Sequence, residues 1–247
     1  MASIPLSSAS VEALKKEVRR VYDERKSSHL SESLAAALGF NTHAALLTEL
    51  KRQDNDPLYC LLDEEKFDAR MQALGYSADP YFDFEDVKTS CMISTTCNYA
   101  YEIKYRSLRD RAWRNVIICA VNEGLRLKLF SLRPGDNRWV GHARRSETYL
   151  FDFTLPCGLP ARASVSDAGF DELSIHVAVN PKNDWVSASN AGFLAGDVFA
   201  TTWLEREKGA WIQTSLSGFR CRKNLLDLIA KMTVSPCGYG DRGRVIM

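Results

Sequence analysis

Closely spaced Lys and Arg residues in the second half of the chain could bind phosphate groups. Residues 101–145 carry 11 Lys or Arg and 4 Asp or Glu. If alternating residues form strands, these cations share one face of a sheet, with Trp113 or Trp139 available to stack on bases. An ordinary solvated sheet face, whose arginines pair with the acidic residues 1–100, is the alternative. The predicted nucleic-acid-binding residues are Lys104, Arg106, Arg126, Lys128, Arg138, Arg144, Arg145, Arg222 and Lys223.

Residues 30–47 encode two short helices and the turn between them. Gly39 can end the first helix in a left-handed conformation, and Asn41 or Thr42 can cap the second. A helix-turn-helix places its second helix in the DNA major groove. Here that helix offers few base-reading side chains, and residues 1–100 carry 11 Lys or Arg against 16 Asp or Glu. We therefore predict a protein contact rather than DNA reading, through His43, Thr48 and Lys51.

The same module carries a resemblance to known proteins. Its pattern consists of Leu30, Ser31, Ser33, Ala35, Leu38, Gly39, Phe40, Ala44 and Leu46. It resembles the short helical module of some bacterial glyoxalase-superfamily-related proteins and of uncharacterised proteins of plasmids and other mobile elements. The resemblance implies a bacterial accessory protein. It does not imply a glyoxalase metal site, because the chain has only 4 His and no repeated βαβββ unit.

Enzyme motifs are weak in this sequence. Residues 94–96 (Ser-Thr-Thr) and 205–207 (Glu-Arg-Glu) resemble the Ser-Thr-Ser and ExE elements of ADP-ribosyltransferases, but the second segment equally fits the solvated end of a hairpin. His176 is interpreted as a satisfied strand histidine. The GxGxxG at residues 238–243 lacks the following helix that a dinucleotide site needs. We predict no catalytic residue, no metal and no cofactor.

Periodicity predicts a helical module at residues 1–88 and an α+β domain at 89–247 with a mostly antiparallel sheet and a C-terminal helix. The expected helices are 11–26, 31–38, 42–51, 63–75 and 223–233, and residues 77–90 are an expected connector. The expected strands are 101–106, 125–129, 138–143, 147–155, 161–166, 173–179, 197–206 and 210–216.

Residues 109–123 are ambiguous. The β-branched run at 116–121, followed by Asn122-Glu123-Gly124, favours a strand and a hairpin loop, and a helix over 109–123 is the alternative. Residues 134–137 (Pro-Gly-Asp-Asn) predict a turn.

Composition narrows the class of protein. A chain of 247 residues with 45% hydrophobic residues can build a core, and its net charge is +1. It shows no apolar run of membrane-spanning length and no signal-peptide pattern, so we expect a cytoplasmic protein without a membrane partner. The predicted function is non-enzymatic binding of nucleic acid or a nucleoprotein complex. The alternatives are a protein adaptor or inhibitor, including a mobile-element anti-defence protein, and an ADP-ribosyltransferase-like enzyme.

Overall fold

A computed structural model of the chain describes residues 1–53, 55–87, 89–95, 104–139, 148–188, 192–214 and 218–244. The chain divides into two compact units. Unit 1 comprises Met1–Thr95 and Cys237–Tyr239, and unit 2 comprises Thr96–Pro236 and Gly240–Met247. The division therefore falls after Thr95, beyond the predicted boundary at residue 88, and three residues near the C-terminus belong to unit 1.

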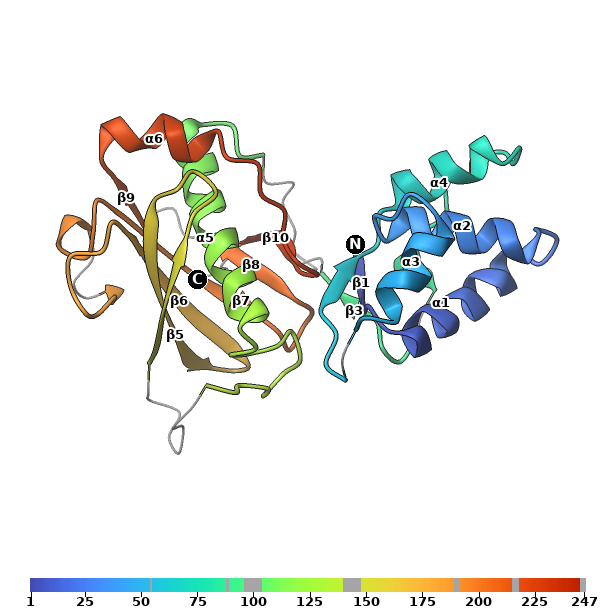
Figure 1. Cartoon of the computed structure of the whole chain (residues 1–247), viewed down its shortest axis with the longest axis horizontal. Helices are drawn as coiled ribbons and strands as arrows, with labels where there is room; N and C mark the ends of the chain where they lie inside the picture. Colours follow the sequence, from blue (N-terminus) through green and yellow to red (C-terminus); the bar gives the residue numbers. More distant parts are fainter. Residues whose placement is uncertain are drawn as a thin grey trace. The chain divides into compact units, whose positions relative to one another are not determined.

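The described part of unit 1 contains four α-helices and a small antiparallel sheet (Figure 1). The helices are α1 (Ser8–Val21), α2 (Ser27–Ala37), α3 (His43–Leu50) and α4 (Glu64–Ala73). The strand order is β2 (Tyr59–Leu61), β1 (Ala2–Pro5) and β3 (Ile93–Ser94). Thr42 caps α3, as one of the two alternatives predicted, and Ser7 caps α1, which begins before the predicted start at residue 11. The three strands were not predicted, because each is too short to show alternation.

Residues 77–90 belong to unit 1 and are only partly exposed, so the prediction that they connect two parts of the chain is wrong. The short 3-10 helix η1 (Phe84–Asp86) places Phe84 fully inside the core of unit 1, where its ring lies 5.3 Å from that of Phe67. Val87 is buried as well. Burial of apolar surface stabilises a fold by about 25 cal/mol per Å². These buried side chains therefore make the segment part of the folded unit.

The sheet of unit 2 confirms the strands expected from 147 to 216. Its order is β10-β8-β7-β6-β5-β4, with β9 also paired to β7, and all its pairs are antiparallel except β10 with β8. The strands are β4 (Tyr149–Thr154), β5 (Pro160–Gly169), β6 (Glu172–Val179), β7 (Val198–Glu205), β8 (Trp211–Thr214), β9 (Phe219–Cys221) and β10 (Gly240–Arg244). Another 3-10 helix, η3 (Gly192–Leu194), precedes β7.

A long helix, α5 (Leu108–Arg126), replaces the hairpin that was favoured for this region. Ser107 and Asp110 form a reciprocal capping box at its start, which satisfies two backbone N–H groups that a strand would not leave open. Ile117, Ile118 and Val121 are fully buried, since α5 packs on one face of the sheet (Figure 1). The β-branched run thus serves a buried helix, and tertiary burial outweighs its modest preference for strands.

Several other strand predictions near this helix are also wrong. Residues 104–106 and 127–129 are not in strands, Lys128 has a left-handed φ of 56°, and Arg138 lies outside any strand. Residues 140–143 lie outside the described residues. The predicted turn at 134–137 is present, with Gly135 at a φ of 73°.

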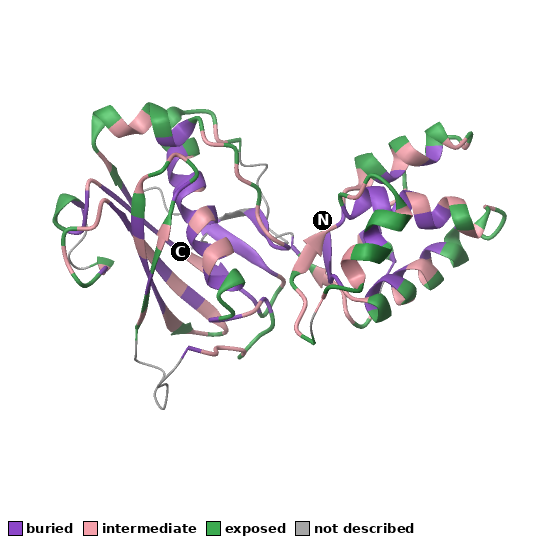
Figure 2. Ribbon diagram, viewed as in Figure 1, coloured by how far each residue is buried: buried purple, intermediate pink, exposed green. Residues whose placement is uncertain are grey.

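The C-terminal helix α6 (Lys223–Ala230) confirms the predicted helix near 223–233 and packs on α5. Figure 2 shows buried residues along α5 and many exposed residues on α6. The fold is α+β, as expected. In the described parts of the chain, no helix combines the length and apolar character needed to cross a membrane.

Candidate nucleic-acid interface

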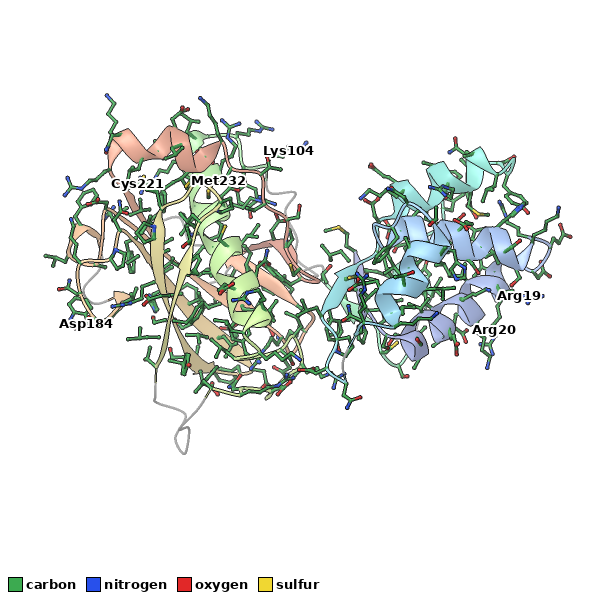
Figure 3. All side chains as sticks on the ribbon, in the orientation of Figure 1. Arg19, Arg20, Lys104, Asp184, Cys221 and Met232 are labelled. Carbon is green, nitrogen blue, oxygen red and sulfur yellow. The ribbon has the colours of Figure 1, made fainter. Side chains whose placement is uncertain are left out.

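Two basic segments of unit 2 meet where α6 packs on the first half of α5. Nη2 of Arg109, in the first turn of α5, donates a hydrogen bond to the carbonyl of Phe219 on β9. Six residues further along α5, Nδ2 of Asn115 donates to the carbonyl of Ile229 on α6 at 3.0 Å. Residues 104–111 and 220–231 therefore lie side by side. In Figure 3, Lys104 and Met232 are labelled near one end of α6 and Cys221 near the other.

These two segments carry all the excess positive charge of unit 2. The chain has 32 Lys or Arg and 31 Asp or Glu. Unit 1 holds 11 of the Lys or Arg and 16 of the Asp or Glu. Unit 2 therefore holds 21 Lys or Arg and 15 Asp or Glu. The two segments hold 8 of these cations and 2 of these anions, and the rest of unit 2 holds 13 of each. We call the group the α5–α6 basic surface, and its members are Lys104, Arg106, Arg109, Arg111, Arg220, Arg222, Lys223 and Lys231.

Of the two carboxylates within these segments, only Asp227 pairs with one of the cations. Asp110 is occupied in the capping box of α5, and Asp227 pairs with Lys231 at 2.6 Å. Four cations have exposed residues and make no side-chain hydrogen bond or ion pair with any other residue that the structure describes. These cations are Arg106, Arg111, Arg220 and Lys223.

Local structure explains why the cations point outward. Between Lys104 and Arg106, the hydroxyl of Tyr105 donates to the carbonyl of Asp241, so the tyrosine is held inward while its two neighbours are exposed. Arg114 stacks over the Tyr105 ring at 5.7 Å and forms an ion pair with Asp241 at 2.6 Å. The basic segment before α5 is thus fixed although it is not a strand.

The ends of α6 differ in how their backbone groups are satisfied. At the C-terminal end, the Asn115 amide donates to the carbonyls of Ile229 and Met232 at 3.0 and 2.9 Å. At the N-terminal end, the capping residue Arg222 makes no side-chain cap. The open N–H groups add the partial positive charge of a helix start to that of Arg222 and Lys223.

Of the nine predicted residues, the structure brings four together, namely Lys104, Arg106, Arg222 and Lys223. Arg126 ends α5, about 25 Å along the helix from Arg109, and binds Glu123 with two hydrogen bonds of 2.8 and 2.7 Å. Arg138 forms an ion pair with Asp136. The predicted single basic sheet face is therefore wrong.

Of the remaining predicted residues, Lys128 lies just beyond the end of α5. Arg144 and Arg145 lie outside the described residues. Arg109 and Arg111 were missed, although the Ser107-x-x-Asp110 capping spacing was a signal for the helix that presents them.

The predicted stacking residues are also wrong. Trp113 and Trp139 are both only 5% exposed, and Trp113 Nε1 donates to the carbonyl of Thr201 at 3.1 Å. Phe193, on η3, is an exposed aromatic side chain beside the basic surface. No sequence signal marked it, because exposure depends on what the rest of the fold leaves uncovered.

The predicted partner-binding residues lie on or just after α3 in unit 1. Thr48 is exposed, with its hydroxyl donating to the carbonyl of Ala44 at 3.0 Å, and Lys51 caps the end of the helix in an exposed position. His43 is half-buried, and its backbone N–H donates to Glu32 at 3.0 Å. Leu47 on the same helix is 45% exposed.

The segment that resembles an ExE element has a local structural role. Glu205 Oε1 accepts hydrogen bonds from the N–H groups of Glu207 and Lys208 at 2.8 and 3.2 Å, which closes the β7–β8 turn. Arg206 is only 2% exposed, and its guanidinium donates to three carbonyl oxygens. Ser94 and Thr95 belong to unit 1, whereas residues 205–207 belong to unit 2 together with Thr96, so the boundary between the units falls within the first element of the resemblance.

His176 is only half satisfied, contrary to prediction. Its Nε2 lies 3.0 Å from Oγ of Ser174, whereas no described residue is a hydrogen-bond partner for its buried Nδ1. Burial lowers the pKa of the imidazole, which favours the neutral form.

Neither the search for a metal site in the described residues nor the comparisons with known proteins indicate a function. Within the described ranges, no group of three or more His, Cys, Asp or Glu side chains could hold a metal ion. No family model matches the chain, and no curated protein or solved structure matches it either. The resemblance of residues 30–47 stays a prediction.

Proposed function

We propose that unit 2 binds nucleic acid through the α5–α6 basic surface. The observation that carries the proposal is the placement of the whole excess charge of unit 2 on two adjoining segments, where four cations have no partner among the described residues. Side chains that repel one another are unfavourable on a folded surface unless an anion compensates them. A phosphate backbone offers such compensation along a line of charges.

Salt dependence tests the proposal directly. Each phosphate contact releases counterions, so the logarithm of affinity falls with the logarithm of salt concentration by about 0.7 to 0.9 per contact. We expect binding of fluorescein-labelled oligonucleotides by the full chain to weaken steeply as salt rises. Replacing Arg106, Arg111, Arg220 and Lys223 by Gln should reduce the slope by about 3 if all four contact phosphates.

A matched control changes the same number of charges elsewhere in unit 2. Arg126, Lys128, Arg133 and Arg138 lie at or beyond the far end of α5, and replacing them by Gln should leave the slope close to that of the unchanged protein. Equal losses in the two variants would show a non-specific charge effect and overturn the proposal. Absence of salt-dependent binding by the unchanged chain would also overturn it, and would favour an adaptor that acts through α3.

A further inference from the structure

An exposed aromatic side chain borders the α5–α6 basic surface. Phe193 on η3 is 46% exposed, and the guanidinium carbon of Arg222 lies 5.0 Å from its ring centroid. On the same short helix, Gly192 packs so close to β9 that an added Cβ would lie 3.7 Å from Cγ of Arg220. The aromatic ring and two of the arginines therefore form one continuous patch.

This patch is held in place by ionic and backbone contacts. Asp197 accepts hydrogen bonds from Arg222 Nε at 2.8 Å and lies 2.9 Å from Lys182 Nζ. Lys182 Nζ also donates to the carbonyl of Phe193 at 3.4 Å. Because Asp197 fixes the guanidinium that covers one side of the ring, the exposed remainder of the ring is pre-organised.

A flat, exposed ring beside arginines suits one class of nucleic acid. In a duplex the bases stack on one another and their faces are not available to an aromatic side chain, whereas single strands present free base faces. Proteins that bind single strands combine cations along the backbone with aromatic rings on which bases stack. The pairing of Arg222 with Phe193 adds a cation–π contact to the ring that would receive the base.

We propose that the α5–α6 basic surface binds single-stranded nucleic acid, with an unpaired base stacked on the exposed side of Phe193. This inference rests on the proposed function and names its substrate class. The cations supply affinity for phosphates, and Phe193 supplies the preference for unpaired bases.

The test compares oligo(dT), oligo(U) and a blunt DNA duplex, each about 15 nucleotides long, with the full chain. The unchanged protein should prefer the single strands, and the two homopolymers distinguish DNA from RNA as the strand. Phe193→Ala should weaken single-strand binding by roughly ten-fold or more, leave duplex binding unchanged and keep the salt slope. Phe193→Tyr should retain the preference, because its ring can still stack.

A control and two contrary outcomes complete the experiment. Phe170 is 89% exposed at the β5–β6 turn, so Phe170→Ala should have no effect on binding. Equal affinity for single strands and duplex, or an unchanged preference in Phe193→Ala, would overturn this inference while leaving salt-dependent binding in place. Loss of all salt-dependent binding in the unchanged protein would instead overturn the proposed function itself.

Discussion

The side-chain amide of Asn115 donates a hydrogen bond to the carbonyl of Ile229 at 3.0 Å and another to that of Met232 at 2.9 Å. Asn115 is 3% exposed, so these bonds form away from water. They satisfy carbonyl groups that the end of a helix leaves open. A single buried residue on α5 thereby fixes α6, and with it the alignment of the two basic segments.

Replacing Asn115 by Ala should destabilise unit 2 by about 1–3 kcal/mol, because it removes buried hydrogen bonds and takes the amide donor away from the carbonyl of Met232. All 5 tryptophans of the chain lie in unit 2, so urea unfolding followed by tryptophan fluorescence reports on that unit. Amide exchange of α6 should also become faster. The exposed Asn224 provides the control, and Asn224→Ala should change neither quantity.

Arg206 is expected to be a structural residue of unit 2. Its guanidinium donates to the carbonyls of Asp171, Ser131 and Asp136, at 3.2, 3.2 and 3.4 Å. Hydrogen bonds from a charged donor contribute more than neutral ones, and we expect Arg206→Met to cost about 3 kcal/mol. Arg206→Lys should not restore stability, since an ammonium cannot span the same three acceptors.

The measurement for Arg206 is again urea unfolding followed by tryptophan fluorescence. Lys208→Met removes an exposed cation two residues away and should leave the unfolding midpoint unchanged. A midpoint for Arg206→Met equal to that of the unchanged protein would show that these loops do not depend on the guanidinium.

The ion pairs of Asp197 should make stability depend on pH in acid. The hydrogen bond from Lys182, with further bonds from Arg222 and Asn180, holds the pKa of Asp197 at about 2, below its ordinary 3.8. A lowered carboxyl pKa contributes stability above the unfolded-state value, and this contribution is lost as pH falls from about 4 towards 2. Because the side chain of Asp197 is 25% exposed, solvent screens its ion pairs, and we expect them to contribute roughly 0.5–1 kcal/mol to the free energy of unfolding.

Comparison of Asp197→Asn with the unchanged chain checks this dependence. The difference in unfolding free energy should be present at pH 6 and should narrow as the pH is lowered below 4. Asp184, a fully exposed partner of Arg162 at 3.4 Å, offers a control whose replacement by Asn should have little effect at any pH. A difference that stays constant across this range would show that Asp197 acts through shape and not through its charge.

Local signals predicted much of the fold correctly. The strands expected at residues 173–179 and 197–206 are present as β6 and β7, and both pack under α5. Thr42 and Gly39 indicated the helix pair of unit 1, since capping and a left-handed φ of 86° are local requirements.

Long-range packing decided what local signals could not. The run at 116–121 is compatible with a strand or a buried helix, and only burial against the sheet selected the helix. Because this segment is a helix, Arg126 lies at the far end of α5, whereas Arg109 and Arg111 lie at its start, beside α6. Phe193 lies beside the basic segments because β9 and η3 pack together.

The sequence by itself determined the α+β class, the segregation of charge and the turn between α2 and α3, all of which depend on residue type and short spacing. It could not determine which cations share a surface, because residues 104–111 and 220–231 are separated by more than a hundred residues. Only the tertiary structure joined them. The reason is physical, since the bonds from Arg109 and Asn115 reach backbone carbonyls, which no sequence pattern identifies.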